Sequence, residues 1–178
     1  KPWNYLLTYL ASDDQTRIMA YNRVIKKLPM DPSSFLQKLE SLFEIEKMKD
    51  SFNPKRKNEI AICLKGEWYK LKPKENKFET IYASLDVSII QDKVLSPILG
   101  IEDVRASENI FFVGGIKDPL KMEQYITKKE NDLFINLYPV DIRDLEKIAD
   151  KGGVMPPKST WFDPKLLSGL ILHDLKEF

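Results

Sequence analysis

The chain has one cysteine, one histidine and no long apolar run. A single cysteine, Cys63, excludes a disulfide framework and favours a reducing compartment. One histidine and one cysteine cannot supply the three or four nitrogen and sulfur ligands of a usual zinc site, so we expect no metal. No apolar stretch approaches the ~20 residues that span a bilayer. The net charge of +1 gives no strong attraction to nucleic acid or to a membrane surface. These features predict a cytoplasmic protein that binds neither.

The length of 178 residues, with 43% apolar and 31% charged positions, fits one domain with its own core, residues 1–178. Lys1 is not a start methionine, so we expect either a processed form or an excised piece of a longer protein.

The first segment, WNYLLTYLA at residues 3–11, is apolar or aromatic at most positions, which predicts a strand covered on both faces. A turn at residues 12–14 and a return strand at residues 17–21 would complete a hairpin. Arg23 would then lie just past the end of that strand.

Asp-Pro pairs predict two helix starts, because Asp caps free N–H groups and Pro fits the first turn. The first pair, Asp31-Pro32, is followed by apolar residues at helical spacing up to Phe43 and then by a strand. Two further strands, at residues 60–64 and 68–71, are joined by a turn at Lys65-Gly66.

The remaining chain alternates between the two kinds of element. The pattern predicts helices at residues 85–99, after Asp118-Pro119 and after Asp141, and strands at residues 110–113, 133–138 and in the final apolar segment. We therefore predict an α+β fold in which helices pack on a mixed, largely antiparallel sheet. The expected order is β-β-α-β-β-β-α-β-α-β-α-β.

The stretch VMPPKSTWFDPKLLSGLILHDL carries the densest set of unusual residue choices. Two prolines lead into Lys158, Ser159 and Thr160, which offer an ammonium and two hydroxyls, and Lys165 follows. Arg23 could add a bidentate fork for phosphate or carboxylate. These residues predict an anion subsite. The same residues also fit a purely structural loop, in which the hydroxyls bond local backbone and the lysines are solvated.

Other patterns fit known motifs less well. The order of glycine, proline and lysine does not match the phosphate loop GxxxxGK[ST], and Gly114-Gly115 lacks the GxGxxG spacing, so we expect a plain turn there. His173 and Ser168, on one expected strand, would point to opposite faces.

Three acidic pairs could each touch a magnesium ion, but we interpret all of them as turn or cap residues: Asp13-Asp14, Glu102-Asp103 and Asp141/Asp144. The lysines at positions 70, 72, 74 and 77 fit either a surface for an acidic partner or a solvated sheet edge.

Three stretches resemble the domain of unknown function 1015 family: MPPKSTWFDPKLLSGLILH near the end, WNYLLTYLASDDQTRIMAYNRVI near the start and DVRASENIFFVGG between them. Members of that family are about twice as long, and this chain is similar to their C-terminal half. Where relatives often have Thr-His-Arg, this chain has Tyr21-Asn22-Arg23, which puts an acid–base role at that position in doubt.

The resemblance implies a bacterial protein whose upstream half usually carries an Asp-Gly-His-His-Arg-Tyr segment. That segment resembles the phosphate-handling motif of ParB-like and sulfiredoxin-like nucleotide-binding domains, which include a free-serine kinase, and it is absent here.

Three hypotheses follow. The chain is a non-catalytic portion that adds an anion-binding loop to a site shared with the rest of its parent chain; or it belongs to an enzyme that transfers phosphoryl groups on a small phosphorylated molecule or nucleotide; or it is a domain that docks an acidic protein through its lysines. The sequence identifies neither a cofactor nor a substrate.

Overall fold

The computed structural model describes residues 4–8, 10, 12, 15–75, 77–115, 118–129, 131–165 and 167–176. Contacts divide the chain into two compact units. One consists of Lys1–Arg17 with Phe162–Phe178, and the other of Ile18–Trp161. Within the described residues, no helix is long and apolar enough to cross a bilayer.

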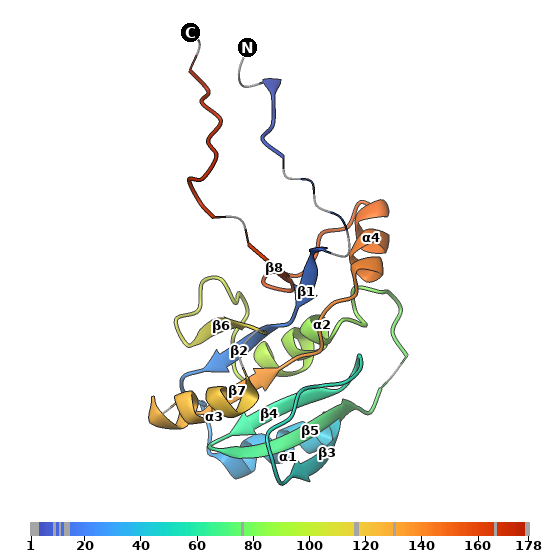
Figure 1. The fold of residues 1–178 in the computed structure, drawn as a ribbon. Coiled ribbons are helices and arrows are strands. Elements are labelled where there is room, and N and C mark those ends of the chain that lie inside the picture. Colours follow the sequence, from blue (N-terminus) through green and yellow to red (C-terminus); the bar gives the residue numbers. More distant parts are fainter. Residues whose placement is uncertain are drawn as a thin grey trace. The chain divides into compact units, whose positions relative to one another are not determined.

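The larger unit is built on a six-stranded sheet with the order β3-β5-β4-β7-β2-β6 (Figure 1). Its strands are β2 (Tyr21–Ile25), β3 (Phe43–Met48), β4 (Ile60–Leu64), β5 (Glu67–Pro73), β6 (Ile110–Gly114) and β7 (Leu133–Asn136). Each neighbouring pair in this sheet is antiparallel. Two further strands, β1 (Arg17–Met19) and β8 (Trp161–Asp163), form a separate two-stranded sheet.

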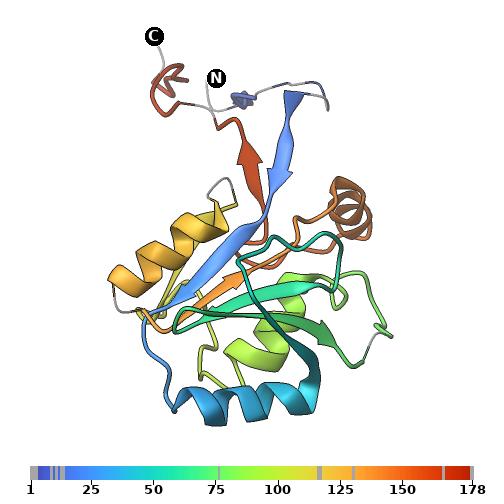
Figure 2. The same ribbon diagram turned by 60° about the horizontal axis from the view of Figure 1, so that its bottom comes forward.

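Helices cover both faces of the six-stranded sheet (Figure 2). On one face lie α1 (Pro32–Leu42) and α2 (Asp86–Ile90), which continues as the π-helical segment η3 (Gln91–Leu95). On the other face lies α3 (Pro119–Lys128). A fourth helix, α4 (Ile142–Asp150), contributes Ile148 to the first core.

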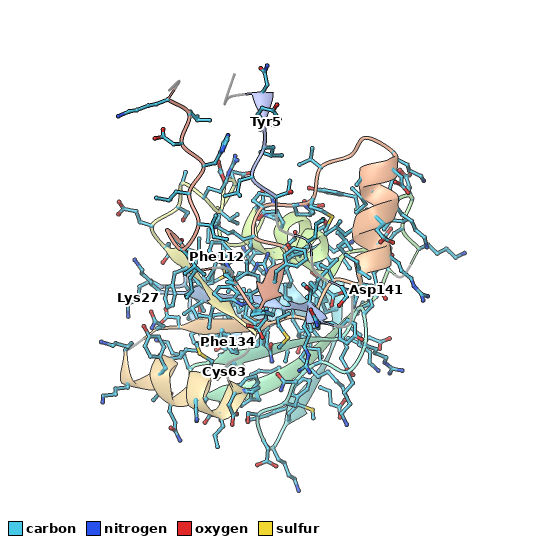
Figure 3. The ribbon with its side chains drawn as sticks, turned by 45° about the horizontal axis from the view of Figure 1, so that its top comes forward. Tyr5, Lys27, Cys63, Phe112, Phe134 and Asp141 are labelled. Carbon is cyan, nitrogen blue, oxygen red and sulfur yellow. The ribbon has the colours of Figure 1, made fainter. Side chains whose placement is uncertain are left out.

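The alternation of side chains along the strands sorts the core into two layers. On β4, Ile60, Ile62 and Leu64 join the layer of α1 and α2, whereas Ala61 and Cys63 join the layer of α3. Cys63 pairs in register with Phe134 of β7, and Figure 3 shows both side chains at the centre of the sheet. Because β4 is buried on both faces, its sequence is apolar at every position.

The helix starts that were expected from Asp-Pro pairs are confirmed. The Asp31 side chain accepts a hydrogen bond of 3.0 Å from the Ser34 amide, and Asp118 caps α3 in the same way through the Leu120 amide. The turn at Lys65-Gly66 is also confirmed, and both of its residues have positive φ (51° and 89°). That conformation matches the right-handed twist of the two flanking strands.

The α+β fold class is confirmed, and the order of elements is the expected one. The six-stranded sheet is antiparallel throughout rather than mixed. The first and the last strand in the sequence, however, are not formed by the residues that were expected. Among the described residues of 3–11 no strand forms, and Leu6 and Leu10 are exposed, so the predicted hairpin is wrong there. Asp13 and Asp14 lie outside the described residues. A strand needs a partner and a covering layer, and the described chain supplies neither for this segment.

The last predicted strand is wrong for the same reason. Residues 170–175 have no regular structure, and Leu170, Ile171 and Leu172 are exposed. The strand expected at residues 133–138 ends at Asn136, while the expected strand at 17–21 is divided at Ala20 between β1 and β2.

Candidate anion-binding site

Arg23 lies in the middle of β2, between Phe112 of β6 and Ile135 of β7 in register. The expectation that it lies past a strand end is wrong. The adjacent polar residues Asn22 and Arg23 interrupt the apolar pattern, yet both are buried, and Arg23 is only 1% exposed. The strand continues because its backbone pairs on both sides, whatever the polarity of its side chains.

Two carbonyl oxygens hold the Arg23 guanidinium. Its Nη1 donates to the Tyr21 carbonyl, and its Nη2 donates to the Lys158 carbonyl over 3.1 Å. Its buried Nε has no hydrogen-bond partner among the residues that the structure describes. Within the described residues, Arg23 takes part in no ion pair.

Burial lowers the pKa of Arg23 to about 9, because the low-dielectric interior disfavours the charged form. The side chain therefore still carries its positive charge at neutral pH. A buried cation without a counter-charge destabilises the fold, since carbonyl dipoles replace only part of its hydration.

Lys158 brings a second cation to the same place. Its ammonium lies 5.7 Å from the Tyr21 ring centroid and 6.0 Å from the Phe112 ring centroid. The Arg23 guanidinium carbon lies 5.7 Å from the same Phe112 ring. Two like charges thus lie near the same aromatic ring, and no described carboxylate forms an ion pair with either.

The loop that carries Lys158 is well anchored. Pro156 and Ser159 are buried, Thr160 is half-buried, and Lys158 itself is exposed with a φ of 54°. A non-glycine residue in this left-handed conformation is strained, and such strain persists where surrounding structure holds it. Arg23, Lys158, Ser159 and Thr160 therefore lie in one unit, with Arg23 bound directly to the loop.

Lys165 has a different setting. It is exposed and belongs to the unit of Lys1–Arg17 and Phe162–Phe178. Its participation in the site stays a prediction.

The cluster of aromatic side chains beside the site was not predicted from the sequence. Tyr21 packs against Phe112 (ring centroids 5.5 Å apart) and against Trp161 (5.3 Å). A Cβ atom on Gly114 would lie 2.8 Å from the Trp161 ring, and one on Gly115 would lie 2.8 Å from the Ala20 carbonyl oxygen. The glycine pair therefore permits close packing beside the site. The alternation of residues 110–114 was the signal that could have placed Phe112 on the face of Arg23.

Asn22 is the residue at which the sequence resemblance led us to expect histidine in relatives. Its side-chain oxygen accepts a hydrogen bond of 3.0 Å from the Leu137 amide, and the residue is buried. This residue joins β2 to the end of β7.

The remaining candidates do not gather. His173 and Ser168 are exposed on segments without a strand. Asp103 pairs with Arg105, and Asp144 pairs with Lys57. In the described parts of the chain, no group of three or more His, Cys, Asp or Glu residues could hold a metal ion.

The strand with the lysine run has neighbours on both sides, because β5 lies between β3 and β4. Lys70 forms an ion pair with Glu46 of β3, and Lys74 donates to the Glu40 carbonyl. The hypothesis of a docking sheet edge is therefore wrong for this strand.

The family of proteins of unknown function DUF1015 matches residues 1–88. The resemblance to that family is confirmed for these residues. The position of the chain in the C-terminal half of a longer member stays a prediction. No curated protein matches the sequence.

Solved structures share the fold. A free serine kinase in complex with AMP is 14% identical with a TM-score of 0.52, and the match covers 84% of this chain and 55% of that one. A conserved hypothetical protein from Pyrococcus furiosus is 13% identical with a TM-score of 0.52, over 84% of this chain and 57% of that one. At these identities the likeness shows the fold alone. The chain spans little more than half the length of either protein.

Proposed function

We propose that this chain supplies an anion-binding surface to a site that other residues of a longer protein complete. The anion is a phosphate or carboxylate of a small molecule or nucleotide. One observation carries the proposal: Arg23 and Lys158 both lie within about 6 Å of the Phe112 ring centroid, and no described carboxylate forms an ion pair with either cation.

The two cations have different tasks. Lys158 is exposed, so its ammonium is the group that contacts the anion directly. Arg23 is buried, so it acts through its positive potential and through its hydrogen bond to the Lys158 carbonyl. That bond fixes the loop and thereby orients the ammonium and the two hydroxyl residues that follow.

Among the described residues no acid–base pair accompanies these groups, and in this proposal the chain contributes binding rather than the reacting groups. The fold shared with a free serine kinase in complex with AMP supports a phosphoryl-transfer enzyme as the complete protein. In that enzyme the reacting groups lie outside this chain, which would form the C-terminal half. The free, buried Cys63 thiol fits a bacterial cytoplasm, where thiols stay reduced.

Titration of inorganic phosphate and AMP into the chain, followed by two-dimensional amide NMR, tests the proposal. We expect saturable shifts in the amides of the Lys158 loop and of β2. Lys158→Gln should weaken binding about tenfold, which corresponds to about 1.4 kcal/mol. Lys38→Gln, on the exposed face of α1, makes the same charge change and should leave the affinity unchanged. Equal effects of the two variants would show only a general charge attraction.

A further inference from the structure

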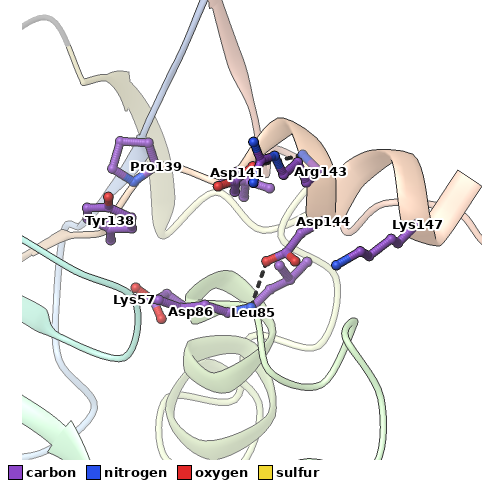
Figure 4. Close-up of a pocket in the computed structure, with 10 residues that line it drawn as sticks. Lys57, Leu85, Asp86, Tyr138, Pro139, Asp141, Arg143, Asp144 and Lys147 are labelled. Atoms are coloured by element: carbon purple, nitrogen blue, oxygen red, sulfur yellow. Dashed lines mark hydrogen bonds and ion pairs between the residues drawn. The ribbon is translucent and has the colours of Figure 1, made fainter.

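A cavity of about 230 Å³ lies in the larger unit between the start of α2 and the start of α4. Its lining includes Asp86 at the first turn of α2, Tyr138 after β7, and Arg143 and Lys147 on α4 (Figure 4). None of these residues belongs to the site of Arg23 and Lys158. The volume suits a metabolite of amino-acid size and is below that of a typical drug-sized pocket, roughly 300 Å³ or more.

Asp86 is the deep charged group of this cavity, with 5% of its surface exposed. Its Oδ1 accepts hydrogen bonds from the Asn58 amide (2.8 Å) and from the Asn58 side chain (3.3 Å). Within the described residues, its buried Oδ2 makes no hydrogen bond of normal geometry, although the Tyr138 amide lies close enough to lower the pKa of the carboxyl. Buried carboxylate oxygens are normally satisfied, so this one calls for a donor.

A protonated amine meets this requirement best. It donates hydrogen bonds and also offsets the buried negative charge, which a neutral hydroxyl cannot do. Lys57 does not fill that role, because its ammonium donates to Asp144 over 2.7 Å (Figure 4). Because Asp144 offsets the charge of Lys57, Lys57 repels an incoming ammonium group only weakly.

The rim of the cavity offers the opposite charge. Arg143 and Lys147 are one turn apart on α4, hence on the same helix face, and both are exposed. Within the described residues, neither forms an ion pair. Two further carboxylates line this edge: Asp141 caps α4 through the Arg143 amide (2.8 Å), and Asp144 is held in its ion pair with Lys57. A carboxylate on the ligand would therefore find two free cations at the rim.

We propose that this cavity binds a small zwitterion of the α-amino-acid type. The ligand ammonium lies against Asp86 Oδ2, and the ligand carboxylate lies between Arg143 and Lys147. The proposal stands apart from the function of Arg23 and Lys158, because the two sites share no residue.

Amide NMR of the chain with L-serine, L-alanine, ethanolamine and lactate as separate probes tests this. Ethanolamine lacks the carboxylate and lactate lacks the amine. We expect saturable shifts at Asn58, Asp86 and the first turn of α4 with the two amino acids, and at least about tenfold weaker binding of the other two probes.

Variants separate the two ends of the ligand. Asp86→Asn should abolish amino-acid binding, and the double variant Arg143→Gln with Lys147→Gln should weaken it about tenfold or more. The double variant changes exposed positions only, so it keeps the test open even if Asp86→Asn fails to fold. Lys151→Gln, just past the same helix, is the matched control and should bind as the unaltered chain does.

The absence of saturable shifts with both amino acids would overturn the proposal. So would equal binding of lactate or ethanolamine, or unchanged affinity in the double variant.

Discussion

Arg23 and Lys158 are 135 positions apart in the sequence, and the guanidinium of the first donates a 3.1 Å hydrogen bond to the carbonyl of the second. The bond ties the second strand of the chain to the loop that follows α4. It uses a buried charge where a neutral donor would be less costly. Such an arrangement is expected where the charge itself has a use, such as attraction of an anion.

Arg23→Lys should lower the free energy of unfolding by about 1–3 kcal/mol, because an ammonium cannot reproduce the planar fork that reaches both carbonyls. Urea denaturation followed by circular dichroism measures the change. Arg56→Lys, at an exposed loop position, is the control and should change stability very little. A loss at Arg23 no larger than at Arg56 would contradict a clamping role.

Lys158 should behave unlike an ordinary surface lysine, because its φ of 54° lies in the left-handed region. Lys158→Gly and Lys158→Ala both remove the ammonium, yet the glycine variant should be more stable by about 1 kcal/mol. At Lys121 in α3 the order should reverse, with alanine more stable by a similar amount of about 1 kcal/mol. Thermal unfolding of the four variants tests this. If the alanine variant is more stable than the glycine variant at both positions, the loop is not strained at Lys158.

Asp86 should make the protein more stable in mild acid. Burial raises the pKa of Asp86 to about 6, against opposing effects of the Asn58 and Tyr138 amides and Lys57. Between that value and its ordinary pKa of 3.8, the folded state binds more protons than the unfolded state. This contribution to stability is therefore largest below pH 4 and is lost as the pH rises to about 6, a change of about 3 kcal/mol.

Asp86→Asn should remove that pH dependence. Asp31→Asn provides a control of opposite sign, because hydrogen bonds from Ser34 lower the pKa of Asp31 to about 2. The stability that its charge adds is present above pH 4 and disappears as the pH falls through 2. Denaturant unfolding across this range measures both. If the dependence of stability on pH is unchanged in Asp86→Asn, the Asp86 carboxyl is not its source.

Gly115→Ala should destabilise the fold by about 1–3 kcal/mol, because the new methyl group would overlap the Ala20 backbone. Gly100→Ala meets open space but carries a φ of 67°, so its loss should be limited to about 1 kcal/mol of backbone strain. Near-ultraviolet circular dichroism should change in the first variant alone, since Gly115 adjoins the strand that carries Tyr21. Equal spectra and equal losses would contradict the close-packing argument.

Local chemistry was enough to predict the helices and the turn. An Asp cap, a following proline and an apolar stripe act within a few residues, so α1, α3 and α4 could be found without knowledge of their partners. The Lys65-Gly66 turn is equally local. Strands depend on pairing with distant segments, and for that reason the apolar runs at residues 3–11 and 170–175 were misassigned.

The sites show the same limit. The hydrogen-bond donors at Lys158, Ser159 and Thr160 could be recognised as a cluster in the sequence. The burial of Arg23 depends on strand register and could not be predicted. Asp86 follows Ser84-Leu85 and looks like an ordinary helix-start residue. Its enclosure becomes apparent only when the Asn58 loop and α4 are placed against it.

The single thiol of the chain lies on the strand at the centre of the sheet, within the core layer of α3, and burial raises its pKa to about 12. A disulfide reagent in solution can then react only when the core layer between α3 and β4 opens. The labelling rate of Cys63 would therefore report how often the core opens at the innermost strand, without an engineered probe. Ligands that bind the Lys158 loop or the Asp86 cavity should lower this labelling rate, and ligands that bind elsewhere should leave it unchanged.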